Sequence, residues 1–474
     1  MTQKDFYKIT DYIRKIIEGT SFENHVFAVG GSVRDLAMNN EIKDIDLVID
    51  LPNGGVDFAE WCREQGYTKT IVVYQTYGTA MFKFNQFPDE EIECVMTRGE
   101  KYIDKESRNP VTVFADINED AIRRDLTINA LYYNISASKI LDLVGGVNDI
   151  EKQIIRTTNE NPDVVFDDDP LRILRVIRFS TRYGWNIENK TFQSMKKFVD
   201  RLSIITKERI RDEFNKILLC KNAVMGINIL HEIGAMKYII PEFEQCYGMT
   251  QNGFHFGDVA EHTLAVLDHH CKEFQNENSL IERLACLLHD IGKIKTKTIK
   301  DGKIHFYNHE YVGAKMCIDI LKALKYDNDT IDEVSFLIKN HMRTKQAGEC
   351  GKFMKDKSLN KLLYDCKTFD RFESLMRVIE CDNMSHKAEH NIPGQYVHLV
   401  LRVKQEGNHM KMFGYKLPIT GNDIMESLNI GPCPMIAKIN DRLIKRAFHN
   451  PDLGRNECLK MLPGIKKEIE NSKK

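Results

Sequence analysis

The sequence predicts an α/β domain, built from a mixed sheet with helices, followed by an elongated all-helical body. Residues 1–150 alternate between β-like runs such as HVFAVGG and DIDLVID and helix-like runs such as SVRDLAM. After residue 150 strand signals become rare, and long helical periods such as DPLRILRVIRFSTRYG dominate. The length of 474 residues exceeds the roughly 250–300 residues at which a single core stops growing, so several domains are expected.

Polar stretches between the periodic segments indicate where the domains join. Candidate joints lie at residues 157–170, 247–258 and 386–394. They favour a division into an α/β head, a helical neck, a second helical domain and a helical tail, at residues 1–150, 151–250, 251–395 and 396–474.

The composition is that of a folded protein without a membrane segment. Apolar residues make up 42% of the chain and charged residues 29%, which argues against wholesale disorder. Twelve cysteines occur singly with no CxxC pair, which argues against a zinc ribbon or a disulfide framework and favours a reducing cytoplasm. The first residues predict an amphipathic helix without an apolar signal core, and no later run reaches the roughly 18 apolar residues of a membrane span.

The formal net charge of −2 does not by itself indicate nucleic-acid binding. A net charge hides its distribution, because an acidic metal site and a basic groove cancel in the sum. The charge therefore counts only mildly against a nucleic-acid partner.

Two aspartates lie two residues apart in the β-like run KDIDLVID. Asp44 and Asp46 are expected to leave the same face of a strand, about 7 Å apart. Glu93, in the later β-like run EIECVMTR, is a candidate third ligand. Carboxylate oxygens suit Mg²⁺, and two such ions can hold the attacking and leaving oxygens of a phosphoryl transfer. Taken alone, alternate carboxylates are more often a solvated strand face.

The segment FAVGGSVRD, which precedes the aspartates, favours the metal site over that plain reading. Gly30 and Gly31 lie between a predicted strand and a predicted helix, where backbone N–H groups can cradle a triphosphate. Arg34 adds positive charge, and Asp35 can brace the loop. The order of these motifs resembles the nucleotidyltransferase superfamily that includes tRNA CCA-adding enzymes and bacterial poly(A) polymerases.

A second motif, AIRRDLTINALYYN, follows the head's strands. Asp125 and Asn129 are four residues apart on an expected helix and would share a face. An isolated RRD is more often a surface charge cluster. The string RRDxxxNA, however, resembles a motif of the same family, which implies that Arg124, Asp125 and Asn129 contact the phosphates and ribose of a nucleotide.

The helix predicted for DPLRILRVIRFSTRYG carries arginines on one face. At 100° per residue, Arg172, Arg175, Arg178 and Arg182 fall within an arc of roughly 120°, opposite the leucines and isoleucines. One face of this helix is therefore expected to be a cationic stripe that binds nucleotide or RNA.

Asp169 has two readings at the start of this helix. Pro170 suits the first helical position, so Asp169 can simply cap the helix. Alternatively, Asp169 accepts the amino hydrogens of cytosine or adenine while Arg172 donates to the ring nitrogen, which would admit CTP and ATP and reject UTP and GTP. The run resembles the acidic-Asp-x-x-Arg motif of bacterial-type CCA-adding enzymes, with Asp168 where glutamate is frequent.

Histidines and aspartates recur in a fixed order along the second helical domain. They are His262, His289, Asp290, His309, His341 and Asp382. The set resembles the HD phosphohydrolase superfamily. The resemblance implies a divalent transition metal such as Ni²⁺, Mn²⁺ or Co²⁺, held by His262, His289, Asp290 and Asp382, with His309 and His341 as further candidates. Lys293 would steady phosphate charge on a phosphoester such as a 2′,3′-cyclic phosphate.

Together these resemblances imply template-independent addition of CMP, CMP and AMP to the 3′ end of tRNA from CTP and ATP. The segment RGEKYIDKESRNPVTVFADINED matches a flexible loop of the family and favours full CCA addition or A addition over addition of CC alone. Addition of A alone, poly(A) synthesis, and an HD phosphohydrolase with a non-catalytic RNA-binding head stay open as alternatives. The oligomeric state and a cellular or viral source also stay open.

Overall fold

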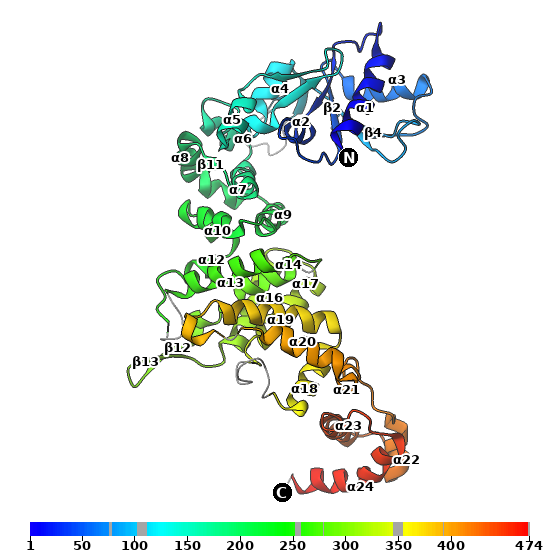
Figure 1. The fold of residues 1–474 in the computed structure, drawn as a ribbon, viewed down its shortest axis with the longest axis vertical. Coiled ribbons are helices and arrows are strands. Elements are labelled where there is room, and N and C mark those ends of the chain that lie inside the picture. Colours follow the sequence, from blue (N-terminus) through cyan, green and yellow to red (C-terminus); the bar gives the residue numbers. More distant parts are fainter. Residues whose placement is uncertain are drawn as a thin grey trace. The chain divides into compact units, whose positions relative to one another are not determined.

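The computed structural model describes residues 1–74, 78–101, 111–251, 257–277, 279–344, 354–391 and 393–472. The chain divides into two compact units, Met1–Tyr238 and Ile239–Lys474 (Figure 1). The predicted division into four domains is finer than this and stays a prediction.

A seven-stranded mixed sheet forms the centre of the first unit in the part of the chain described. Its strand order is β3-β4-β5-β2-β1-β8-β9. The strands are β1 (Val26–Val29), β2 (Ile45–Ile49), β3 (Ile71–Tyr74), β4 (Thr79–Phe82), β5 (Ile92–Met96), β8 (Leu131–Asn134) and β9 (Lys139–Asp142). Strands β2 and β5 run parallel and the other neighbours antiparallel. The predicted mixed sheet is therefore confirmed.

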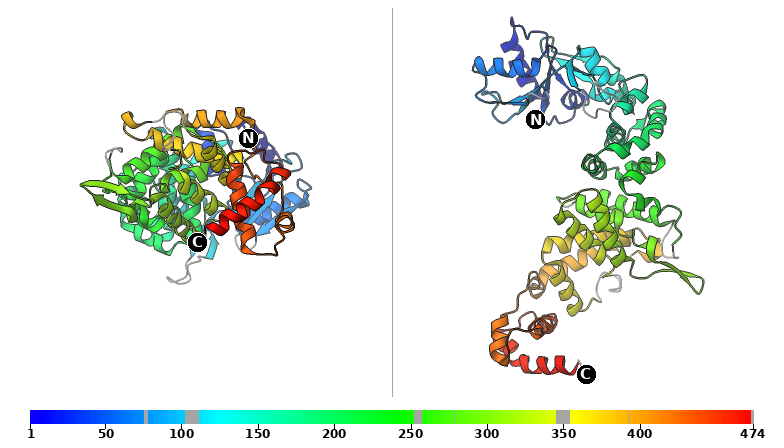
Figure 2. Two further views of the ribbon diagram at one scale, coloured as in Figure 1. Left: turned by 90° about the horizontal axis from the view of Figure 1, so that it is seen from below. Right: turned by 180° about the vertical axis from the view of Figure 1, so that it is seen from behind.

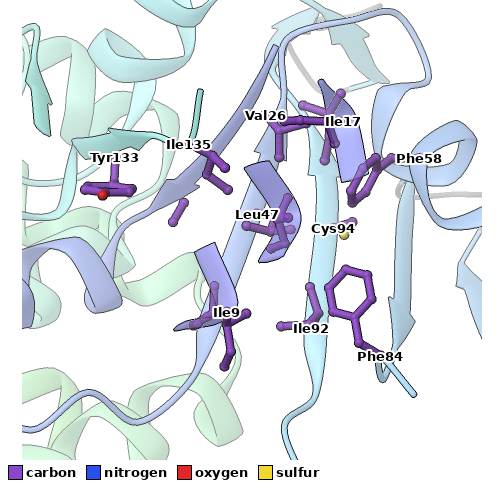
Figure 3. Close-up of a cluster of buried hydrophobic side chains, with 14 of the residues drawn as sticks. Ile9, Ile17, Val26, Leu47, Phe58, Phe84, Ile92, Cys94, Tyr133 and Ile135 are labelled. Atoms are coloured by element: carbon purple, nitrogen blue, oxygen red, sulfur yellow. The ribbon is translucent and has the colours of Figure 1, made fainter. Parts of the chain in front are cut away.

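Helices α1 (Gln3–Ile17) and α3 (Gly54–Glu64) supply apolar side chains to the core on one face of this sheet. Figure 3 shows Ile9 and Ile17 of α1 in one cluster with Leu47 and Ile92 of the sheet. Successive strand residues point to opposite faces. Because Ile45, Leu47 and Ile49 enter this core, Asp46 leaves the sheet on the other side.

The opposite face carries a smaller apolar cluster and the candidate site. Helix α4 (Ile117–Arg123) contributes Ala121 to this cluster, beside Val29, Val48 and Tyr132 of the sheet. A separate antiparallel pair, β6 (Arg98–Lys101) with β7 (Val111–Phe114), precedes α4. Residues 102–110 of the predicted flexible loop lie outside the described residues.

The expected helix through Asp125 and Asn129 is wrong. Helix α4 ends at Arg123, Arg124 has an extended backbone, and Thr127–Asn129 form a 3₁₀ turn. The Asp125 carboxylate accepts the neighbouring Leu126 N–H at 2.9 Å, a local hydrogen bond that competes with helical pairing.

The remainder of the first unit is helical, as predicted, apart from one short strand pair. Its helices are α5 (Gly146–Lys152), α6 (Pro162–Asp168), α7 (Leu171–Tyr183), α8 (Asn189–Phe198), α9 (Lys207–Leu218) and α10 (Ala223–Glu232). The pair joins β10 (Ile154–Ile155) to β11 (Asn186–Ile187) in parallel.

The second unit is a helical assembly with one hairpin. Its main helices are α13 (Val259–Glu273), α14 (Ser279–Leu288), α16 (His309–Ala323), α17 (Asn328–Asn340), α18 (Asp356–Cys366), α19 (Phe369–Met384) and α20 (Gln395–Gln405). Hairpin β12 (Lys297–Lys300) and β13 (Lys303–Phe306) projects from these helices (Figures 1 and 2). This hairpin corrects the expectation of an all-helical body. Asp301 and Gly302 both have positive φ, the geometry of a two-residue hairpin turn.

Three C-terminal helices enclose an apolar cluster of their own. They are α22 (Gly421–Leu428), α23 (Pro434–Ala447) and α24 (Arg455–Asn471). Among the described residues, no helix combines the length and apolar character needed to cross a bilayer.

Candidate active site and metal centre

Two neighbouring parallel strands bring the head's carboxylates together. Asp46 on β2 stands directly opposite Glu93 on β5. The neighbours of Glu93, Ile92 and Cys94, enter the apolar core, so Glu93 shares the free face with Asp46. Asp44 lies two residues before Asp46, at the entrance of the strand.

Asp44 and Glu93 both act on the ionisation of Asp46. Its pKa is raised to about 6, first because burial disfavours the charged form, and then because Asp44 and Glu93 repel it. Arg124 acts in the opposite direction. A cluster of mutually repelling carboxylate oxygens fits a divalent cation such as Mg²⁺, which would remove the repulsion.

The two glycines lie beside this cluster. Gly30 follows Val29, the β1 residue that pairs with Asp46. Its φ of 74° lies in the region that favours glycine. A Cβ on Gly30 would lie 3.7 Å from an Arg124 nitrogen, so the arginine approaches the bare backbone closely. Gly31 begins the short helix α2 (Gly31–Ala37).

Two side chains hold Arg124 in place. Its Nε donates to Asp120 Oδ2 at 3.0 Å and to the Tyr132 hydroxyl at 3.1 Å. Tyr132 pairs with Val29 across the sheet, so it lies in the same row as Asp46. The sequence does not single out Asp120 or Tyr132, because a polar residue outside a motif gives no indication of which side chain it contacts.

The predicted ribose and phosphate readers form one hydrogen-bonded chain. Arg34 donates to both oxygens of Asp35 at 2.9 Å and to Asn129 Oδ1 at 2.7 Å. Asn129 donates to Asp125 Oδ1 at 3.3 Å, and Arg175 of α7 donates to Asp125 Oδ2 at 2.7 Å. Arg34 is only 5% exposed. In this structure Arg34 braces the hydrogen-bonded chain, and its expected contact with phosphate stays a prediction.

Two of the four arginines in the stripe of α7 pair with carboxylates. Arg175 pairs with Asp125, and Arg178 donates to Glu213 Oε2 of α9 at 2.6 Å. Helix α9 and the loop after α4 carry the opposite charges at these two positions, and the expected contact of Arg175 and Arg178 with nucleotide or RNA stays a prediction.

Asp169 does contact the backbone at the start of α7. Its Oδ1 accepts the Leu171 N–H at 3.0 Å, and its Oδ2 accepts a hydrogen from Arg209 at 2.8 Å. The helix begins at Leu171, one position later than predicted. Arg172 donates to the Val165 carbonyl at 3.4 Å. The hydrogen bond to Leu171 supports the interpretation of Asp169 as a helix cap. The role of Asp169 in base recognition stays a prediction.

Asp168, the other acidic residue of this motif, is exposed at the end of α6.

Five helical segments of the second unit bring together the whole predicted set of metal ligands. His262 lies on α13, His309 begins α16, and Asp382 lies on α19. His289 and Asp290 directly follow α14, and His341 directly follows α17. All six are buried.

Asp290 joins two groups of ligands. Its Oδ2 lies 3.3 Å from His289 Nε2 and 3.7 Å from His262 Nε2, and its Oδ1 lies 3.3 Å from His309 Nε2. His262, His289 and Asp290 form one set that could hold an ion, and Asp290, His309 and His341 form another.

The histidine rings are oriented as metal ligands are. The Nδ1 atoms of His289, His309 and His341 lie 2.7–2.9 Å from backbone carbonyls three residues earlier. Each Nδ1 can therefore carry the proton, which leaves the Nε2 lone pair for a metal. Among the described residues, the buried Nε2 atoms of His289 and His341 have no hydrogen-bond partner. The residues present fit a transition-metal ion.

The electrostatics favour the binding forms of His341 and Asp290. His289 differs, because burial lowers its pKa but Asp290 and Asp382 outweigh burial and raise that pKa above its usual value. Burial holds the pKa of His341 well below its usual value, and neighbouring His289 and His309 act in the same direction. Burial would raise the pKa of Asp290, but His289 and Lys293 outweigh it and hold that pKa well below the usual range. A neutral imidazole and an ionised carboxylate result.

Three further residues complete the surroundings of Asp290 and Asp382. Lys293 Nζ lies 2.5 Å from Asp290 Oδ2 and therefore pairs with a ligand. Gly292 lies so close to α16 that a Cβ would come 2.1 Å from the His309 carbonyl oxygen. His386 Nε2 lies 3.7 Å from Asp382 Oδ1, although the sequence indicated only a joint there. Its spacing of four residues from Asp382 was the available signal.

Three family models match the chain. The Poly A polymerase head domain matches residues 26–156, the probable RNA and SrmB-binding site of polymerase A matches 184–247, and the HD domain matches 259–375. The three matches follow the order expected from the motifs.

Known proteins match over most of the chain. A multifunctional CCA protein of Acinetobacter baumannii (strain SDF) is 30% identical over 373 residues, 75% of this chain and 83% of that protein. An A-adding tRNA nucleotidyltransferase of Deinococcus radiodurans is 32% identical over 234 residues, 48% of this chain and 53% of that protein.

The fold matches a solved structure as well. The CCA-adding enzyme of Bacillus stearothermophilus, crystallised with CTP, superposes with a TM-score of 0.66 at 19% identity, covering 94% of each chain. That likeness shows the fold, and the Acinetobacter relative shows the family. The chain belongs to the family of multifunctional CCA proteins, which are tRNA nucleotidyltransferases with an HD domain.

Proposed function

We propose that this protein adds CMP, CMP and AMP to the 3′ end of tRNA, using CTP and ATP. The observation that carries the proposal is the cluster of Asp44, Asp46 and Glu93 beside Gly30 and Gly31, on the polar face of the sheet. The family membership agrees with it. Cytoplasmic localisation stays a prediction from the cysteine pattern.

In this proposal the three carboxylates hold Mg²⁺, with Asp46 and Glu93 presented by adjacent strands. Bound Mg²⁺ would activate the terminal hydroxyl of the tRNA and stabilise the pyrophosphate that leaves. The N–H groups around Gly30 and Gly31 would cradle the triphosphate. Arg124, oriented by Asp120 and Tyr132, would place positive charge against the phosphates.

In this proposal four residues outside the carboxylate cluster select the base and the ribose. Asp169 and Arg172 would read the pairing edge shared by cytosine and adenine, and Asp125 and Asn129 would contact the ribose. Arg175 fixes Asp125 at 2.7 Å and thereby orients the ribose contact.

The test uses tRNA transcripts that end before CCA, after C and after CC, each with one labelled nucleoside triphosphate. Three, two and one added nucleotides are expected when CTP and ATP are both present. The Asp44→Ala/Asp46→Ala variant should add none, whereas Asp89→Asn, at an exposed position of the same unit, should match the wild type. Nucleotide addition by the double variant would refute the assignment.

Addition of A alone is the second candidate, because the Deinococcus relative carries that activity in its name. The same transcripts decide between them. An A-adding enzyme would extend only the transcript that ends in CC, and a poly(A) polymerase would extend all three without a fixed stop.

We further propose that the HD domain is a metal-dependent phosphohydrolase that acts on phosphoesters such as a 2′,3′-cyclic phosphate at a tRNA end. The support is the convergence of six buried ligands with two unpartnered Nε2 atoms among the described residues. Ni²⁺, Mn²⁺ and Co²⁺ suit imidazole and carboxylate ligands.

The HD proposal is tested on 2′,3′-cyclic phosphate ends with each metal in turn. Hydrolysis that rises with metal and is lost in His289→Ala is expected. Equal rates in the wild type and in His289→Ala would remove the phosphohydrolase and leave the head's activity untouched. An active HD site combined with an inactive head would favour the third alternative, an RNA-binding head.

A further inference from the structure

A cavity of about 680 Å³ lies among α16, α17, α18 and residues 414–416 of the second unit. Its size falls within the roughly 300–1,000 Å³ of small-molecule sites. Four aromatic rings contribute to its walls, from Tyr311, Phe336, Tyr364 and Tyr415. The hydroxyl of Tyr415 is buried and has no hydrogen-bond partner among the described residues.

Positive charge dominates this cavity. Lys339, Lys361, Lys367 and Lys416 line it, and in the described part of the chain none of them lies within ion-pair distance of a carboxylate. The fifth cation, Arg343, pairs at 2.6 Å with Asp365, the only acidic residue among the described residues of the lining. Four lysines around one cavity, against one carboxylate of the described lining that already pairs with Arg343, favour an anionic ligand.

One of these lysines occupies a costly backbone conformation. Lys367, at the end of α18, has φ 66° and ψ −37°. A side chain at positive φ is strained, and outside glycine such strain collects at functional positions. Glycine would hold this turn more easily, so the lysine has to be explained by something other than stability.

The cavity is separate from the metal centre. On α17, Phe336, Lys339 and Asn340 line the cavity, whereas His341 follows the helix into the ligand set. At about 100° per residue these three positions point about 100° or more away from His341. The cavity therefore lies on another side of α17.

We propose that this cavity binds a nucleoside di- or triphosphate, with the base between aromatic rings and the phosphates on the lysines. Aromatic faces stack on bases, and lysine ammonium groups pair with phosphate oxygens. Lys339 Nζ already lies 6.0 Å from the Tyr311 ring centroid, so cation and ring are close enough to serve one ligand. The volume of about 680 Å³ suits one nucleotide. This inference is independent of the proposed activities of the head and the HD site.

Equilibrium dialysis of the full chain with labelled ATP, in a buffer with a chelator, tests the proposal. The chelator weakens any metal-dependent binding in the head. We expect Lys361→Gln/Lys416→Gln to weaken ATP binding at one site by about tenfold or more, the effect of losing charge-assisted hydrogen bonds. Lys315→Gln, an exposed lysine of α16 outside the lining, should bind ATP as the wild type does.

Unchanged ATP binding in the double variant would overturn the proposal. So would binding of a tRNA transcript, but not of ATP, that depends on the same two lysines, since the surface would then be an RNA contact.

Lys367→Gly separates ligand binding from folding. It should raise the melting temperature, because glycine accepts this φ, and at the same time weaken ATP binding. A stabilised variant that keeps full ATP affinity would show that Lys367 has no part in a site.

Discussion

At the scale of single residues, alternation along strands determines which side chains carry the chemistry. Ile45 and Leu47 enter the core, so Asp46 must face the other way, and the parallel register sets Glu93 next to it. This much follows from the sequence once the strands are paired. The position of Asp120, which orients Arg124, does not follow from the sequence. It depends on the packing of α4 against the sheet.

Asp46→Asn should stabilise the metal-free protein at alkaline pH. The folded-state pKa is raised to about 6, above the usual 3.8, so ionised Asp46 destabilises the fold above pH 6 and this penalty disappears as the pH falls towards 4. The raised pKa corresponds to about 3 kcal/mol at pH 8. Denaturant unfolding of both proteins with a chelator, at pH 8 and pH 4, measures the difference.

The exposed substitution Asp89→Asn serves as the control and should change the unfolding free energy equally little at both pH values. A stability gain for Asp46→Asn that persists at pH 4 would contradict the electrostatic explanation.

Single histidines show the limit of reading ligands from sequence. The six expected ligands do converge, and His386 joins them through Asp382, four residues before it. The sequence HKAEHNIPG indicated a joint between domains, since polar residues and a proline are typical of loops.

At the scale of secondary-structure elements, helix α7 connects the head's network to the neck. Its apolar side is buried as predicted, whereas its arginines pair with Asp125 and Glu213. Helical periodicity predicts the face on which an arginine lies, but the partner comes from elements distant in sequence, here the loop after α4 and helix α9.

Asp169→Ser distinguishes the two roles of Asp169. Serine can still accept the Leu171 N–H, so its stability should match the wild type, whereas Asp169→Ala should lose about 1 kcal/mol. If Asp169 reads the base, both variants should incorporate UTP and GTP more readily relative to CTP and ATP. Single-nucleotide incorporation rates and thermal unfolding measure the two effects. Wild-type base selection by Asp169→Ser would mean that Asp169 only caps.

The hairpin β12–β13 had a readable signal. The sequence KTIKDGKIHF places Asp301-Gly302 between two β-like runs, the usual pattern of a two-residue hairpin turn. The long helical periods on both sides obscured it. This hairpin and the short pair β10–β11 depart from the expected all-helical body, and they leave the helical ligand-bearing elements unchanged.

At the scale of the whole molecule, contacts concentrate within two units that meet at Tyr238 and Ile239. A fragment that ends at Tyr238 should therefore fold by itself and unfold cooperatively, because its sheet and helices keep their cores. Circular dichroism during heating checks this. A fragment that lacks a cooperative transition would show that the second unit is needed for folding of the first.

Metal removal should act on the two units differently. A buried set of histidine and aspartate ligands binds metal only when the second unit is folded. A metal concentration of 100 times the dissociation constant should therefore raise the free energy of unfolding of that unit by about 2.7 kcal/mol. Calorimetry with Ni²⁺, Mn²⁺ or Co²⁺ and then with a chelator should shift the transition of the second unit, and His289→Ala should abolish the shift. An equal shift in the fragment that ends at Tyr238 would contradict this assignment.

The sequence by itself determined the α/β head, the helical remainder, the strand and glycine turn that carry Asp46 and Gly30, and the order of the HD ligands. These properties rest on local periodicity and on motifs within short stretches, which can be recognised without the tertiary structure. Only the tertiary structure decided that Arg34 and Arg175 bind the predicted readers Asn129 and Asp125, that Asp290 joins two ligand groups, and that lysines of α17 and α18 surround one cavity. Each of these depends on side chains far apart in the chain, whose distances are set by packing.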